Sequence, residues 1–163
     1  MQARIANPAL TVPGAMQHIL ALGTLAKKAL PAKTALLVQL RASQINGCGF
    51  CTDMHAFELK LKGDSDERLW SVAVWRDTPY FTDAERAALA LTEAATRLDD
   101  RADPVPDAVW DEARKHYDDA TLSALVLEIA LINFWNRVNV TTRQPAGKAA
   151  HQAAEMAAAA AAA

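Results

Sequence analysis

Several features are scarce in this sequence of 163 residues, and each scarcity excludes a class of protein. Lys and Arg number 17 against 19 Asp and Glu, so the formal net charge is -2 and no basic excess is present. Nucleic acids and anionic membranes attract proteins with basic patches, so neither is an expected partner. No uninterrupted run of about 18 apolar residues, the length that crosses a bilayer, is found.

Cysteine and targeting signals are equally scarce. The first eight residues lack the apolar core of a secretory signal, which predicts a cytoplasmic location. The two cysteines, Cys48 and Cys51, lie three positions apart. In a reducing cytosol such a pair is more often catalytic or metal-binding than structural. The loop that the pair would close is also too short to stabilise the fold much.

Strand patterns are nearly absent, whereas helical periodicity and helix start and stop signals recur. Asp64–Glu67 and Thr82–Glu85 have the spacing of capping boxes, and Gly63 stands where a C-cap glycine is expected. The sequence predicts an all-α fold of about seven helices, covering residues 16–30, 33–45, 48–61, 64–75, 86–98, 107–117 and 122–140.

The chain reads as one domain over residues 1–147, followed by an alanine-rich tail over 148–163. The domain is long enough to bury a substantial core. Alanine has the highest helix propensity, which favours a terminal helix in the tail. A run of alanines can also stand for side chains that were not assigned, so residues 157–163 carry no functional information.

The most informative stretch, Gly47–His55, contains both cysteines. If a helix begins near Cys48, then Cys48, Cys51 and His55 lie on one face, because residues i, i+3, i+4 and i+7 share a side. The positive end of the helix dipole favours thiolate over thiol. Two thiols and an imidazole in this arrangement predict a dithiol redox site.

Other interpretations of the motif fit its context less well. Buried cysteines pack as small hydrophobes, but the flanking glycines and the helix start point to an accessible site. A structural zinc site takes about four ligands, and a fourth would have to come from a distant histidine. A c-type haem requires histidine where the chain has Thr52, and a thioredoxin-like site expects a βαβ unit. The distant histidines are His18, His116 and His151.

Two segments resemble one known family. Leu40–His55, LRASQINGCGFCTDMH, resembles the core motif of the AhpD-like alkylhydroperoxidase family, also called the carboxymuconolactone decarboxylase superfamily. Ile132–Val140, INFWNRVNV, resembles the late helix of that family. The match extends from about residue 30 to residue 147. It implies an all-α homo-oligomer, and a peroxidase whose paired cysteines cycle between dithiol and disulfide.

The resemblance also assigns roles to residues. Cys51 resembles the peroxide-reacting cysteine, Cys48 the cysteine that resolves it, and His55 the histidine of the proton relay. The expected partners are a hydroperoxide substrate and a thiol-reducing electron donor. We expect no metal, haem, flavin or other cofactor. The order in which the two cysteines react depends on their accessibility, which the sequence does not specify.

The chain departs from the family pattern in its proton relay. The relay usually begins with a glutamate twelve residues before the first cysteine, where this chain has Leu36. The best-known members carry histidine just before the second cysteine, where this chain has Phe50. Gln39, one turn from Leu36, offers an amide to a water or to His55, but an amide is no general base at neutral pH. The sequence predicts a weakened or rewired relay.

Two carboxylates are candidates for this relay. If buried, Glu128 would need a partner or a raised pKa and would stand in for the missing glutamate. We expect it instead to face solvent or to pair with an arginine, because ionised carboxylates are rarely buried alone. Glu58, three residues after His55, has the spacing to orient the imidazole. Our expectation for it is a solvated helix charge.

Two other functions stay open. A decarboxylase-like enzyme acting on a small cyclic acid fits the superfamily, although that branch typically lacks the cysteine pair. A redox-sensing protein would use the disulfide to control its assembly and not for turnover. The leading interpretation is a thiol-dependent peroxidase.

Overall fold

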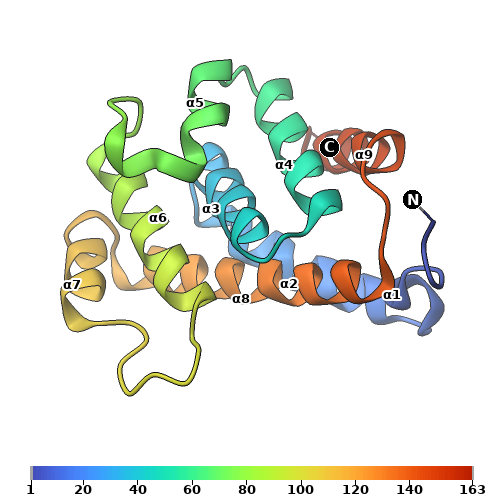
Figure 1. Ribbon diagram of the computed structural model, residues 1–163, viewed down its shortest axis with the longest axis horizontal. Coiled ribbons are helices and arrows are strands. Elements are labelled where there is room, and N and C mark those ends of the chain that lie inside the picture. The colour runs from blue at the N-terminus through green and yellow to red at the C-terminus, as the bar shows by residue number, and fades with distance from the viewer. Residues whose placement is uncertain (1, 163) are drawn as a thin grey trace.

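The computed structural model describes residues 2–162, and within that range it contains helices and no strand, which confirms the all-α fold class (Figure 1). Nine α-helices and one 3₁₀ helix follow one another along the described chain: α1 (Pro8–Thr11), α2 (Ala15–Lys28), α3 (Ala32–Ile45), α4 (Gly49–Leu61), α5 (Asp66–Ser71), η1 (Val72–Asp77), α6 (Asp83–Thr96), α7 (Asp107–His116), α8 (Asp119–Thr142) and α9 (Lys148–Ala162). The expected tail helix thus corresponds to α9, whereas Ala163 lies outside the described residues.

The helix boundaries differ from the sequence prediction in two places. The short helix α1 was not predicted; Asn7 caps it by accepting a hydrogen bond from the backbone of Ala9. The segment predicted as one helix over 64–75 divides into α5 and η1, and η1 is itself kinked at Val74, whose backbone angles are non-helical. The cap of α5 is Ser65 and not Asp64. The capping box at Thr82 and Glu85 forms as predicted and begins α6.

Helix α8 is the central element of the fold. It extends along the long axis of the molecule (orange in Figure 1) and contacts α2, α3, α4, α6 and α7. Within the described chain it is also the one helix long and apolar enough to cross a membrane, and 44% of that window is buried. Glu128, Asn133, Asn136 and Arg137 interrupt the apolar residues of α8, so the helix contains no uninterrupted apolar run of that length. The same test is passed by the core helix of a globular protein, and α8 places buried polar side chains against α3.

Two apolar clusters meet at α3. One contains Val38 together with side chains of α6, α7 and α8, among them Leu91 and Leu125. The other contains Leu36, Leu37 and Leu40 with side chains of α4, α5, η1 and α6. Helix α3 is therefore buried on nearly all sides, which explains why its sequence shows little amphipathic contrast. Leu36 belongs to this apolar core.

Glu93 on α6 joins three elements through its carboxylate. It accepts hydrogen bonds from Arg41 on α3 at 2.7 Å and from Arg76 and Trp75 on η1 at 2.6 and 3.0 Å. Arg97 adds a fourth contact at 3.1 Å. Burial opposes ionisation of Glu93, but the hydrogen bonds from Arg76, Trp75 and Arg41 outweigh it and lower the pKa to about 2. The Glu93 carboxylate therefore holds η1 and α6 against α3.

We predict that Glu93→Gln lowers the free energy of unfolding by about 2–3 kcal/mol at pH 7. The contribution of Glu93 is present above its unfolded pKa near 4.5 and is lost as the pH falls toward 2, because the unfolded chain takes up the proton first. Urea unfolding at pH 7 and pH 3 measures both effects. Glu112→Gln, at an exposed glutamate, is the control, and an equal loss in both variants would contradict the prediction.

Candidate active site

The two cysteines lie at the turn between α3 and α4. Gly47 takes a left-handed conformation with φ of 65°, which reverses the chain after α3. Cys48 is the N-cap of α4, and its Sγ accepts a hydrogen bond from the backbone N–H of Cys51 at 3.3 Å. The two cysteines form a disulfide with their Cα atoms 5.4 Å apart. The predicted position of the pair at a helix N-terminus is confirmed.

The disulfide is enclosed by apolar side chains. Cys48 and Cys51 are 1% and 2% exposed and pack with Ala42 and Ile132, while Phe50 and Trp135 lie against this cluster. The expectation of an accessible site, based on the flanking glycines, is therefore wrong for this state of the chain. Ile132 on α8 fills the space that solvent would occupy. A substrate reaches the sulfurs only when the covering side chains move.

His55 lies one turn after Cys51 on α4, and its Nδ1 is 2.7 Å from Oε2 of Glu58. Both side chains are buried, so the expectation that Glu58 is a solvated charge is wrong. Burial lowers the pKa of His55 and Lys27 adds to this, although the hydrogen bond and the charge of Glu58 act in the opposite direction. A neutral imidazole that donates from Nδ1 to a carboxylate keeps a free electron pair on Nε2.

Glu128 is buried in the centre of the fold. It is 1% exposed and its Oε1 accepts a hydrogen bond from Nε2 of Gln39. The expectation that Glu128 faces solvent or an arginine is wrong, because Glu128 pairs with Gln39 across the α3–α8 contact. Gln39, for which a water or His55 was the suggested partner, contacts Glu128 instead. Burial raises the pKa of Glu128, and the charge of Glu58 adds to the rise, whereas Lys27 and Gln39 oppose it.

Two buried oxygen atoms of this pair lack a hydrogen-bond partner. They are Oε1 of Gln39 and Oε2 of Glu128. A buried unpaired oxygen costs about 1–3 kcal/mol. A proton on Oε2 of Glu128 would allow it to donate to Oε1 of Gln39, and one proton would then satisfy both atoms. The two unpartnered oxygens and the upward direction of the Glu128 pKa shift both favour the protonated form of this side chain.

Further along α8, amide side chains hold the turn that carries Cys48. Asn136 donates to Oγ of Ser43 at 3.0 Å, and Asn46 donates to Oδ1 of both Asn133 and Asn136 at 2.9 Å. The backbone N–H of Cys48 donates to the carbonyl of Ser43 at 3.0 Å. The position of the first cysteine is therefore fixed through α3 to α8.

Sequence reasoning missed a contact of the second cysteine. Nδ2 of Asn139 donates to Sγ of Cys51 at 3.3 Å, and Oδ1 of Asn139 accepts from Asn7 at 3.2 Å. A signal was present, because Ile132, Asn136 and Asn139 have the spacing of one helix face and lie in the segment that resembles the family's late helix. The partner residue Asn7 gave no such signal.

Helix α9 is attached to the outer side of α4. Asp53 accepts hydrogen bonds from the backbone N–H of Gly147 at 2.7 Å and from Nε2 of His151 at 3.1 Å. The ring of His151 stacks on Phe57, with 4.2 Å between the ring centroids. Among residues 2–162, no group of three or more His, Cys, Asp or Glu side chains is arranged to hold a metal ion.

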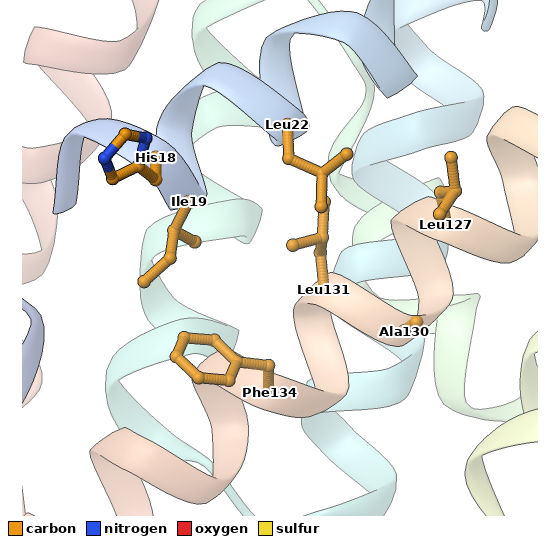
Figure 2. A pocket seen from close by; sticks show the side chains of 7 residues that line it. All are labelled: His18, Ile19, Leu22, Leu127, Ala130, Leu131 and Phe134. Atoms are coloured by element: carbon orange, nitrogen blue, oxygen red, sulfur yellow. The ribbon is translucent and has the colours of Figure 1, made fainter. Parts of the chain in front are cut away.

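An apolar groove lies between α2 and α8, with a volume of about 380 Å³ (Figure 2). Side chains from both helices line it, and no cysteine is among them. Figure 2 shows Leu22 of α2 directed toward Leu131 of α8, with Phe134 farther along α8. Its lining consists of His18, Ile19, Leu22, Leu127, Ala130, Leu131 and Phe134.

Comparisons with known proteins agree on one family. The sequence model of the Carboxymuconolactone decarboxylase family matches residues 13–94. The uncharacterized protein YdfG of Bacillus subtilis is 36% identical over 107 residues, which are 66% of this chain and 71% of YdfG. The uncharacterized protein YnjA of Escherichia coli is 34% identical over 110 residues, 68% of this chain and 59% of YnjA.

A crystal structure of an Agrobacterium tumefaciens protein of unknown function, whose name links it to antioxidant defence and AhpD, is similar throughout. It superposes with a TM-score of 0.82 at 34% identity, covering 90% of this chain and 99% of that one. The likeness therefore includes the central helix α8 as well as the α3–α4 hairpin with the cysteines.

We predict that Glu128→Gln stabilises the protein, and increasingly so as the pH rises. An acid whose folded pKa is raised contributes fully below its unfolded pKa near 4.5 and loses that contribution as the pH rises through the folded pKa. Glutamine keeps both hydrogen bonds to Gln39 without titrating. Urea unfolding of variant and parent from pH 4 to pH 8.5 gives the difference in free energy at each pH.

The matched variant Glu128→Leu has no group to pair with Gln39. We expect it to lower the free energy of unfolding by about 1–3 kcal/mol, because the buried amide then lacks partners. A difference between Glu128→Gln and the parent that stays constant across the pH range would show that Glu128 does not titrate there.

Proposed function

The chain belongs to the carboxymuconolactone decarboxylase family, which includes the AhpD-like proteins, and from this premise we propose that it is a thiol-dependent peroxidase. Function in the family is peroxidase-related or decarboxylase-like. The observation that carries the finer proposal is the Cys48–Cys51 pair at the N-terminus of α4, with the buried His55–Glu58 pair one turn later. A reversible dithiol next to a proton acceptor is suited to the two-electron reduction of a hydroperoxide.

The proposed cycle consumes one hydroperoxide for two thiols. The thiolate of Cys51 attacks the terminal oxygen of the hydroperoxide, the O–O bond breaks, and an alcohol leaves after taking up a proton. Cys51 is then a sulfenic acid. The sulfur of Cys48 attacks it, the Cys48–Cys51 bond forms, and water leaves. A dithiol reductant restores both thiols and is itself oxidised to a disulfide.

His55 moves the proton in this proposal. Its lowered pKa keeps the imidazole neutral at pH 7, so Nε2 accepts the proton of the Cys51 thiol and returns it to the leaving alkoxide. Glu58 holds the ring through Nδ1 and stabilises the imidazolium formed in between. These are the roles of base and orienting carboxylate.

A rewired relay is supported by the carboxyl groups of this chain. Leu36 is an apolar core residue and exchanges no proton. Glu58 instead contacts His55 directly, and Glu128 with Gln39 provides a buried acid whose pKa is influenced by Glu58. We assign Glu58 to the imidazole and Glu128 with Gln39 to proton storage behind it. The cycle needs a thiol reductant, which fits a cytoplasmic location.

The test is rapid mixing of the reduced protein with hydrogen peroxide and with an alkyl hydroperoxide. We expect saturable disulfide formation, one hydroperoxide consumed for two thiols, and loss of the reaction in Cys51→Ser. Cys48→Ser should stop at a sulfenic acid that dimedone traps, because no thiol resolves it. Thiol counting and mass spectrometry follow both steps.

The neighbouring conservative variant Thr52→Ser is the control and should react at the parental rate. A rate no faster than that of a free thiol of similar pKa would contradict the peroxidase proposal. Consumption of a small cyclic acid that is unaffected by both cysteine substitutions would favour the decarboxylase-like alternative.

We further propose that the α2–α8 groove is covered by a second copy of the chain. Its lining is almost wholly apolar and includes the exposed side chains of Leu22, Leu127 and Phe134. The exposed Leu25, one turn after Leu22 on the same face of α2, extends this apolar surface. Apolar surfaces of this kind are typical of contacts between proteins. The family resemblance, which implies a homo-oligomer, indicates the same occupant.

We predict that Leu22→Glu and Phe134→Glu each reduce the assembly to monomers, because a charge in an apolar interface loses its hydration without gaining a partner. Sedimentation velocity measures the assembly at micromolar concentration. Trp70→Glu, on the exposed surface of α5 outside the groove, should leave it unchanged. A monomeric parent, or groove variants that assemble like the parent, would contradict this proposal.

A further inference from the structure

The side chain of Asn139 contacts the sulfur of the second cysteine. Its Nδ2 lies 3.3 Å from Sγ of Cys51, within hydrogen-bond distance for a sulfur acceptor, and Asn139 itself is buried at 4% exposure. The peroxidase mechanism above does not use this contact. An amide N–H is a donor only, so it stabilises a sulfur that carries negative charge more than a neutral thiol.

The hydrogen bonds around Asn139 fix which end of its amide faces the sulfur. The nitrogen and oxygen of an amide are assigned from their partners. The backbone N–H of Ala9 donates to Oδ1 of Asn7 at 3.0 Å, so Nδ2 of Asn7 is the atom left to donate. It donates to Oδ1 of Asn139 at 3.2 Å, which directs Nδ2 of Asn139 to Cys51.

Asn7 is itself held against the end of α8. The backbone N–H of Arg4 donates to the carbonyl of Thr142 at 2.9 Å, and Nε2 of Gln144 donates to the carbonyl of Ile5 at 3.1 Å. The N-terminal segment is thereby anchored, just before Asn7, to the residues that follow Asn139. The orientation of the amide follows from a backbone donor and requires no rearrangement when Cys51 becomes charged.

We propose that Asn139 is a catalytic residue that stabilises the thiolate of Cys51, and that Asn7 is the residue that positions it. The inference rests on the proposed function only in taking Cys51 as the reacting cysteine. In the reduced protein the Asn139 N–H donates to the thiolate before the attack. After the cycle it favours release of Cys51 as the leaving thiolate when a reductant attacks Cys48.

The test measures the thiol itself and not turnover. In the Cys48→Ser background only Cys51 titrates, and its thiolate is followed by absorbance near 240 nm and by the pH dependence of alkylation. We expect Asn139→Leu to raise the pKa of Cys51 by about one unit, the effect of one hydrogen bond to a charged group. Alkylation should slow about tenfold at pH values below both pKa values.

Thr92→Val is the matched control, since Thr92 is a buried polar residue of α6 whose hydroxyl donates to the carbonyl of Ala88 in its own helix. The pKa of Cys51 should be unchanged in this variant. A pKa unchanged in Asn139→Leu, or raised equally in both variants, would overturn the inference.

Asn7→Asp tests the positioning role without altering α8. An aspartate still accepts from the Ala9 N–H but cannot donate, so Asn139 should turn its N–H toward Asp and its carbonyl toward Cys51. We expect the pKa of Cys51 to rise at least as much as in Asn139→Leu, and to rise less in Asn7→Ser. Circular dichroism confirms that each variant is folded.

The double variant Asn7→Asp, Asn139→Leu separates this effect from the added charge. If the rise caused by Asn7→Asp disappears on the Asn139→Leu background, it acts through the amide, whereas an undiminished rise overturns the positioning role. These results are independent of peroxide chemistry. A protein without peroxide turnover whose thiol still depends on Asn139 would refute the proposed function and leave this inference intact.

Discussion

The pairing of polar side chains between α3 and α8 is the constraint on which the rest of the structure depends. Glu128 with Gln39 and Asn136 with Ser43 are buried pairs between these helices, and Asn133 with Asn46 is a half-buried pair to the turn that follows α3. If the hydrogen bond of one pair is not formed, its buried polar groups lower the free energy of unfolding by about 1–3 kcal/mol. Because one residue of slip rotates a helix by about 100°, only one register satisfies all three. Apolar packing alone would allow several registers of α8 against α3.

This register determines the environment of the cysteines. Asn46 and Ser43 are fixed to α8, and the turn between them and Cys48 includes Gly47, so the first sulfur has little freedom. The same face of α8 then brings Ile132 over the disulfide and Asn139 to Cys51. The site is therefore enclosed, with His55 buried one turn after Cys51. Solvent can reach the two sulfurs only if elements attached less firmly than the α3–α8 pair move.

The fold class and the placement of the two cysteines at a helix N-terminus could be predicted from the sequence, because both depend on local signals. The capping box at Thr82, the glycine at position 47 and the spacing of Cys48 and Cys51 act within a few residues. What it did not predict are pairs far apart in the chain. Glu58 and Glu128 were expected on the surface because carboxylates usually are, yet helix packing buries both, Glu58 beside His55 of its own helix and Glu128 against Gln39 of α3. Gln39 and Glu128 are 89 residues apart, and Asn7 and Asn139 are 132 apart.

In the proposed relay, carboxyl groups elsewhere in this chain take the place of the glutamate that is missing at Leu36. The apolar side chain of Leu36 extends the core between α3 and α4, and a carboxylate there would be desolvated. Gln39, one turn further, faces α8, where Glu128 supplies a carboxyl group from the opposite helix. A neutral Glu128 is compatible with the apolar core, whereas an ionised Glu128 would be repelled by the charge of Glu58. The proposed proton storage at Glu128 therefore depends on the neutral carboxylic acid. The amide of Gln39 suits this form, because it can donate to one oxygen of the acid and accept from the other.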